Sequence, residues 1–129
     1  AAVLLGGISL AACSIAAVSA YDPIPDSIWT PGSGLDVLSS KGMTGNECCD
    51  PNPGSRSMYL AVDGLHGMAA RDKVTAALVA DGWEPTRCQR GRSGTCLSRD
   101  SLDVYVGKAE LRYAPAGAEV SVYFSRKLD

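Results

Sequence analysis

The chain opens with an apolar segment, residues 1–20, that contains no charged residue, no proline and no aromatic side chain. A helix of this length rises about 30 Å, which matches the hydrocarbon core of a bilayer. We therefore expect one transmembrane helix over residues 1–20. Asp22 and Asp26 follow it, and the first basic residue is Lys41. The positive-inside rule then predicts a single-pass protein of the cell membrane with a cytoplasmic N-terminus and an extracytoplasmic C-terminal domain.

The next stretch, residues 21–46, is rich in proline and glycine and shows no regular hydrophobic period. This composition is typical of a spacer, so we expect a stalk between the membrane and a folded domain. Ile24, Ile28 and Trp29 are apolar residues within it. They are expected to pack either on a neighbouring subunit or back on the domain.

Residues 47–129 alternate between two hydrophobic periods. A period of two residues predicts strands over 57–62, 102–106 and 120–124 and a hairpin over 87–98, and a helical period predicts a helix over 69–81. On that helix Val74 and Leu78 share one face, and Gly82 follows where a left-handed cap belongs. The expected fold is α+β, in the order β-α-β-β-β, with one helix packed on a small antiparallel sheet.

The cysteines indicate an oxidising compartment. Four of them, Cys48, Cys49, Cys88 and Cys96, lie in the predicted domain, and an even set in an exported domain favours two disulfides. A bridge between adjacent residues closes a strained ring, so we expect Cys48 and Cys49 each to pair with Cys88 or Cys96. Three connectivities remain formally open.

The fifth cysteine, Cys13, lies inside the apolar segment in the sequence Leu10-Ala11-Ala12-Cys13. This sequence resembles the lipobox of bacterial lipoproteins, in which the cysteine is lipidated. The apolar run continues after Cys13, whereas lipoproteins usually become polar there, which favours an uncleaved anchor. Cleavage of a leader after Ala20 is a third interpretation, because small residues precede that position.

Small residues recur at four-residue spacing within the apolar segment. Such spacing lets a second helix approach closely, and a helix rich in alanine, glycine and serine is a weak lipid-facing one. We expect the helix to dock on other membrane helices through four small residues: Gly7, Ala11, Ala12 and Ala16.

The distribution of charged residues indicates one candidate binding site. The formal net charge is −2, which gives no global field for nucleic acid. Four arginines nevertheless fall close together around the predicted hairpin, at Arg87, Arg90, Arg92 and Arg99. Guanidinium groups suit phosphate and carboxylate, so this cluster is a candidate site for an anion or for an acidic partner; a solvated, charged hairpin is the plainer interpretation.

Motifs for catalysis or for a cofactor are missing from the sequence. The single histidine, His66, has no nucleophile pattern around it, and the cysteines lack the spacing of a zinc site. We expect a non-enzymatic protein without a metal or cofactor. The preferred function is an accessory subunit of a larger membrane complex, with integral membrane proteins and the bilayer as partners. The alternative is a free-standing envelope module, anchored or lipidated at Cys13, that binds an anionic ligand through the arginines.

Overall fold

The computed structural model describes residues 19–89 and 91–127 of the chain. Residues 1–18 lie outside this part, so the expected membrane helix is not described, nor is its docking face of Gly7, Ala11, Ala12 and Ala16, nor Cys13. Arg90 also lies outside it. Among the described residues, no helix has the length and apolar character needed to cross a bilayer.

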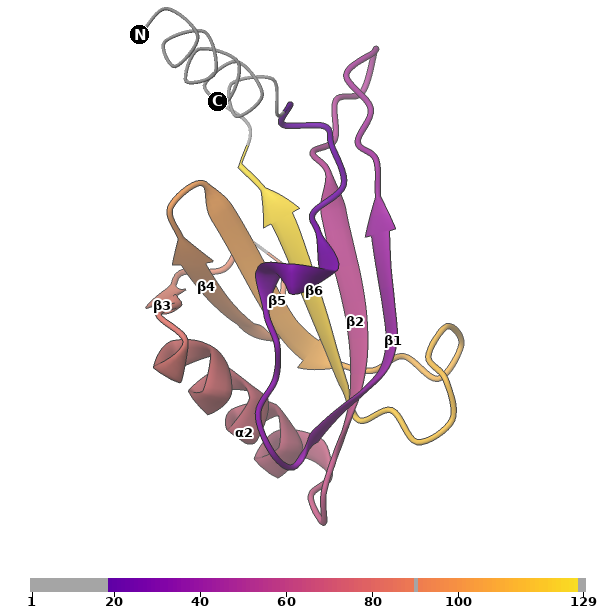
Figure 1. Ribbon diagram of the computed structural model, residues 1–129, viewed down its shortest axis with the longest axis vertical. Coiled ribbons are helices and arrows are strands. Elements are labelled where there is room, and N and C mark those ends of the chain that lie inside the picture. Colours follow the sequence, from indigo (N-terminus) through magenta and orange to yellow (C-terminus); the bar gives the residue numbers. More distant parts are fainter. Residues whose placement is uncertain (1–18, 90, 128–129) are drawn as a thin grey trace, which may run out of the picture.

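One antiparallel sheet and one long helix make up the domain (Figure 1). The elements in chain order are η1 (Asp26–Ile28), β1 (Leu35–Met43), β2 (Ser55–Val62), α2 (Gly67–Ala80), β3 (Glu84–Thr86), β4 (Thr95–Arg99), β5 (Leu102–Lys108) and β6 (Val120–Arg126). The six strands lie in the order β1-β2-β6-β5-β4-β3. The α+β class and the packing of one helix on an antiparallel sheet are thus confirmed, with a six-stranded sheet in place of the smaller one expected.

The segment expected to be a stalk belongs to the sheet. Strand β1 pairs with β2 from Leu35 opposite Val62 to Met43 opposite Ser55, so the β-α-β-β-β order lacked its first strand. The pattern was not visible because a bulge between Val37 and Ser39 interrupts the alternation. As an edge strand, β1 is also mostly exposed, so it carries no apolar face that a sequence pattern would reveal.

The segment before β1 is held against the domain by side chains of the sheet. The Arg56 Nε donates a hydrogen bond to the Ile24 carbonyl oxygen at 2.7 Å, and the Arg126 Nε donates to the Asp22 carbonyl oxygen at 3.2 Å. Ile24 is fully buried and Trp29 is 4% exposed. These contacts correct the spacer interpretation of residues 21–46 and favour the second of the two expectations for Ile24 and Trp29.

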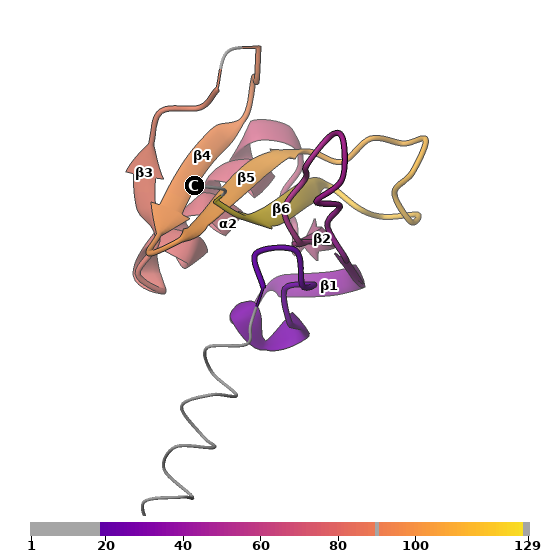
Figure 2. The same cartoon turned by 90° about the horizontal axis from the view of Figure 1, so that it is seen from above.

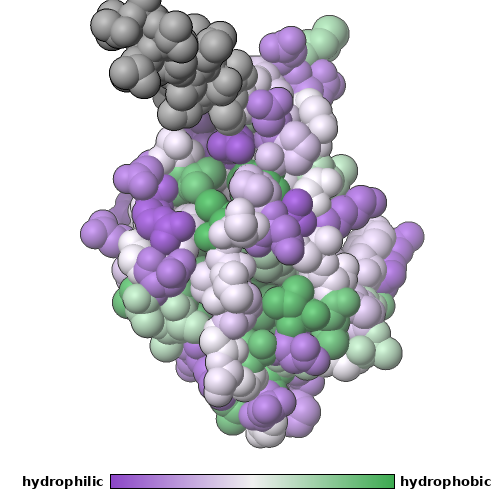
Figure 3. Space-filling model, in the orientation of Figure 1, coloured by the Kyte–Doolittle hydropathy of each residue, from purple (hydrophilic) through white to green (hydrophobic). Residues whose placement is uncertain are grey.

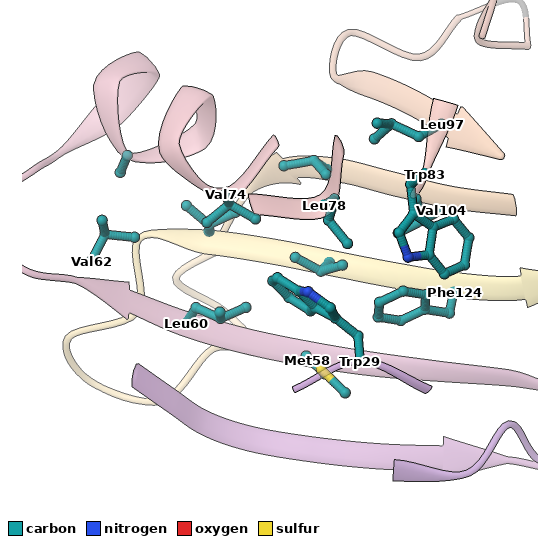
Figure 4. Packing of buried hydrophobic residues seen from close by; sticks show 14 of the residues in the cluster. Trp29, Met58, Leu60, Val62, Val74, Leu78, Trp83, Leu97, Val104 and Phe124 are labelled. Atoms are coloured by element: carbon teal, nitrogen blue, oxygen red, sulfur yellow. The ribbon is translucent and has the colours of Figure 1, made fainter. Parts of the chain in front are cut away.

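The core lies between the sheet and two covering elements, α2 and the segment before β1. Val74 and Leu78 of α2 are fully buried, as predicted. Figure 4 shows Trp29 and Trp83 beside Phe124 of β6, with ring centroids 6.2 Å and 5.4 Å from the Phe124 ring. This aromatic cluster joins the N-terminal segment, the sheet and the end of the helix. Figure 3 shows the outside of this covered side, where hydrophilic and hydrophobic residues are interspersed.

The hairpin expected over 87–98 is displaced. Its first strand is β3, which pairs Glu84 with Ser98 and Thr86 with Cys96, and residues 87–94 form the connection to β4. Pro85 lies within β3. Proline is tolerated there because β3 is an edge strand with no neighbour on its outer side.

Replacing Trp29 with alanine tests the placement of the N-terminal segment. Truncating a buried tryptophan costs about 3–5 kcal/mol, so we expect a clear fall in the urea midpoint followed by far-UV circular dichroism. Leu38→Ala on β1, where the side chain is 37% exposed, is the matched control and should change the midpoint little. An unchanged midpoint for Trp29→Ala would show that the segment before β1 does not contribute to the core.

Candidate binding face

The side of the sheet away from α2 carries no covering element among the described residues. Residues on this side alternate with the buried ones: Tyr105 lies between Val104 and Val106, and Tyr123 between Val122 and Phe124. Tyr123 pairs directly with Tyr105 across β6 and β5, and Tyr105 pairs with Cys96 of β4. We call this side the uncovered face. It is half-buried, and tyrosine and serine predominate on its central strands.

Two long connections border the uncovered face. Residues 87–94 join β3 to β4, and residues 109–119 join β5 to β6. Figure 2 shows the first of these connections rising on the side of the sheet away from the N-terminal segment. Tyr105 lines two hollows, one of about 350 Å³ beside residues 87–92 and one of about 520 Å³ between Ser93 and residues 109–112. The uncovered face is therefore hollowed on two sides of Tyr105.

Basic side chains lie around the first hollow. Arg87, Arg92 and Lys127 line it together with Tyr105 and Tyr123. The Arg92 guanidinium carbon lies 4.8 Å from the centroid of the Tyr105 ring, which is within the range of a cation–π contact. Lys127 Nζ is 3.7 Å from an Asp103 carboxylate oxygen. Arg87 and Arg92 thus supply positive charge at the rim that no described carboxylate neutralises by an ion pair.

The predicted arginine cluster is divided by the sheet. Arg99 lies two residues after the buried Leu97 on β4. Both side chains therefore point to the same side of the sheet, toward α2. The Arg99 Nη1 donates to the Asp81 carbonyl oxygen at 2.9 Å and to an Asp81 carboxylate oxygen at 3.2 Å, and its guanidinium lies 4.4 Å from the Trp83 ring centroid. Since Asp81 is the C-cap of α2, Arg99 stabilises the end of the helix. We therefore no longer assign Arg99 to the anion site.

The cysteine pairing differs from the expectation. Cys88 and Cys96 are bonded to each other, and Cys48 and Cys49 are exposed thiols in the connection between β1 and β2. Strands β6 and β5 separate β2 from β4, a distance of about 14 Å at about 4.8 Å per strand. The Cα atoms of a disulfide are usually about 4.4–6.8 Å apart. The topology therefore keeps the two cysteine pairs apart, and the disulfide ties residues 87–94 to the sheet beside Tyr105.

His66 takes part in a contact at the start of α2. Its Nδ1 lies 2.7 Å from a Glu119 carboxylate oxygen, and the histidine is the N-cap residue of the helix. This hydrogen bond, with a smaller contribution from the Gly67 backbone N–H, holds the pKa of the Glu119 carboxyl below its ordinary value. A carboxylate near the N-terminus of α2 also interacts favourably with the helix dipole. The geometry gives His66 a structural role that the sequence did not reveal.

Comparisons with protein-family models, with curated proteins and with solved structures found no match to this chain. Within residues 19–89 and 91–127, no group of three or more histidine, cysteine, aspartate or glutamate side chains is arranged to hold a metal ion.

The contact between His66 and Glu119 gives a pH-dependent prediction. Because the pKa of Glu119 is lower in the folded state, its stabilisation is present above the ordinary value of 4.5 and is lost as the pH falls through the folded-state pKa. We expect Glu119→Gln to lower the melting temperature near pH 6, and the difference from the unaltered protein to shrink as the pH falls below 4.5. Glu110→Gln in the same connection is the control. A difference that does not vary with pH would show that the charge of Glu119 is irrelevant.

Proposed function

We propose that this domain is a non-catalytic binding module and that its uncovered face holds an anionic ligand. One observation carries the proposal: Arg87 and Arg92 line a hollow whose wall includes Tyr105 and Tyr123. Guanidinium groups bind phosphate and carboxylate through paired N–H donors. Tyrosine adds hydroxyl groups and flat apolar surface at the same place.

The position of the arginines supports a binding role over simple solubility. Arg92 lies within the loop of residues 88–96 that the Cys88–Cys96 disulfide closes, and Arg87 directly precedes that loop. A loop restrained before binding loses less conformational entropy when a ligand arrives. Because the net charge is only −2, attraction of an anion depends on this local cluster and not on the field of the whole domain.

The cellular setting follows from the N-terminal segment and stays a prediction. An anchor over residues 1–20, or a lipid on Cys13, would place the uncovered face in the extracytoplasmic space. Acidic envelope polymers and anionic headgroups there present phosphate or carboxylate, the groups that arginine binds. The accessory-subunit function depends on docking through Gly7, Ala11, Ala12 and Ala16, which lie outside the described residues, so it also remains a prediction.

Charge reversal at the hollow tests the proposed function. We expect Arg92→Glu to weaken the binding of labelled polyphosphate and of labelled poly-glutamate by about tenfold or more, since one charge-assisted hydrogen bond contributes about 1.5–3 kcal/mol. Fluorescence anisotropy at two salt concentrations measures the effect.

Lys73→Glu is the matched control, because it makes the same charge change at an exposed position of α2 on the covered side. Binding should fall little in that variant. Equal losses in both variants would mean that only total charge matters, and no measurable binding of either polymer to the unaltered protein would reject the anionic ligand class.

A further inference from the structure

The connection between β1 and β2 contains a small closed loop that presents two thiols. Its base is an antiparallel bridge, in which the Asn46 N–H donates to the Asn52 carbonyl oxygen at 3.0 Å and the Asn52 N–H donates to the Asn46 carbonyl oxygen at 2.7 Å. The loop between them carries Cys48, Cys49 and Asp50. It joins β1 to β2, at the opposite edge of the sheet from β3 and β4.

Hydrogen bonds within the loop fix the backbone on both sides of the two cysteines. The Cys48 N–H donates to the Asn46 Oδ1 at 3.0 Å, and the Asn52 Nδ2 donates to the Asp50 carbonyl oxygen at 3.1 Å. The Asp50 N–H donates to the Cys48 carbonyl oxygen, which makes a tight turn around Cys49. Cys49 has a φ of 56°, in the left-handed region that non-glycine residues seldom adopt. The backbone is thus held in a conformation that brings the two side chains together.

The two sulfur atoms are close and accessible. Cys48 Sγ lies 2.8 Å from Cys49 Sγ, and both residues are exposed. A disulfide bond is about 2.05 Å long, so the sulfur atoms are within about 1 Å of bonding distance. Because both residues are exposed, a small disulfide can reach either sulfur atom.

We propose that Cys48 and Cys49 form a reversible dithiol–disulfide pair that low-molecular-weight disulfides oxidise. In the first step a thiolate of the pair attacks one sulfur of the small disulfide, which forms a mixed disulfide and releases one small thiol. The neighbouring cysteine then attacks the protein sulfur of that mixed bond and releases the second small thiol. The two protein thiols lose two protons and two electrons in total, and the small disulfide is reduced to two thiols.

The same geometry separates this pair from the other disulfide of the domain. A bond between adjacent residues closes a strained ring, and strained or exposed disulfides are reduced more easily than unstrained ones. Cys88 and Cys96 are separated by 8 positions and are partly buried. We therefore expect the Cys48–Cys49 bond to open in conditions that leave the Cys88–Cys96 bond closed, which makes it the redox-responsive pair.

Acidity affects the rate of this exchange. The hydrogen bond with Cys49 is the main cause that raises the pKa of the Cys48 thiol. Since the thiolate is the attacking form, less of it is present at neutral pH than for a free cysteine. Exchange should therefore accelerate as the pH rises above neutrality.

The test uses the full chain in mixtures of reduced and oxidised glutathione, followed by blocking with N-ethylmaleimide, trypsin digestion and mass spectrometry. Cleavage after Lys41 and Arg56 releases peptide 42–56, which contains Cys48 and Cys49 and no other cysteine. As the mixture becomes oxidising, we expect this peptide to change from carrying two maleimide groups to a form lighter than the dithiol peptide by two hydrogen atoms. Peptides with Cys88 and Cys96 should stay linked at mixtures that keep peptide 42–56 reduced.

Single replacements provide the controls. Cys48→Ser and Cys49→Ser each remove the second nucleophile, so we expect glutathione to remain attached to peptide 42–56 of these variants and not to accumulate on the unaltered protein. These exposed positions should tolerate serine. A persistent glutathione adduct on the unaltered protein, two free thiols in the most oxidising mixture, or a link from peptide 42–56 to Cys88 or Cys96 would each overturn the proposal.

Discussion

One helix cannot cover a six-stranded sheet, and the architecture of this domain follows from that limit. A helix with its side chains is about 10 Å across, whereas six strands at about 4.8 Å span about 24 Å. Helix α2 lies against β5 and β6. The apolar side chains of the remaining strands need another cover, and the segment before β1 provides it with Ile24 and Trp29. Phe124 contacts both Trp29 and Trp83, so the two covers share one aromatic cluster.

Because α2 and the segment before β1 both pack on one side of the sheet, the other side has no cover in the described part of the chain. A strand places successive side chains on opposite sides, so each valine that packs beneath α2 is followed by a residue that faces away from it. On β5 and β6 those residues include Tyr105 and Tyr123. The uncovered face is therefore a direct consequence of a core on one side of the sheet only. The side chains of the connections at its borders determine which ligands it can bind. Arg87 and Arg92 come from such a connection.

The sequence predicted the elements that show a regular period and missed those that do not. The helix was found because Val74 and Leu78 repeat at helical spacing, and β5 and β6 because valines alternate with polar residues. Strand β1 was missed because its bulge breaks the alternation and its side chains are mostly exposed. The arginine cluster is close in sequence but not in space: Arg99 is close to Arg92 along the chain, but it lies two residues after the buried Leu97 on β4 and so points to the opposite side of the sheet. The side of the sheet to which a residue points can be assigned only once the bounds of its strand are known.

The cysteines show how topology limits covalent links in this domain. Both described cysteine pairs are local: the disulfide closes residues 88–96, and Cys48 and Cys49 lie within a closed loop of the β1–β2 connection. Neither pair links the N-terminal segment to the rest of the domain. That segment is held by buried apolar side chains and by the hydrogen bonds from Arg56 and Arg126 to its backbone. The four described cysteines therefore lie in two surface connections, one beside the proposed anion site and one at the opposite edge of the sheet, while non-covalent contacts hold the N-terminal segment on the core.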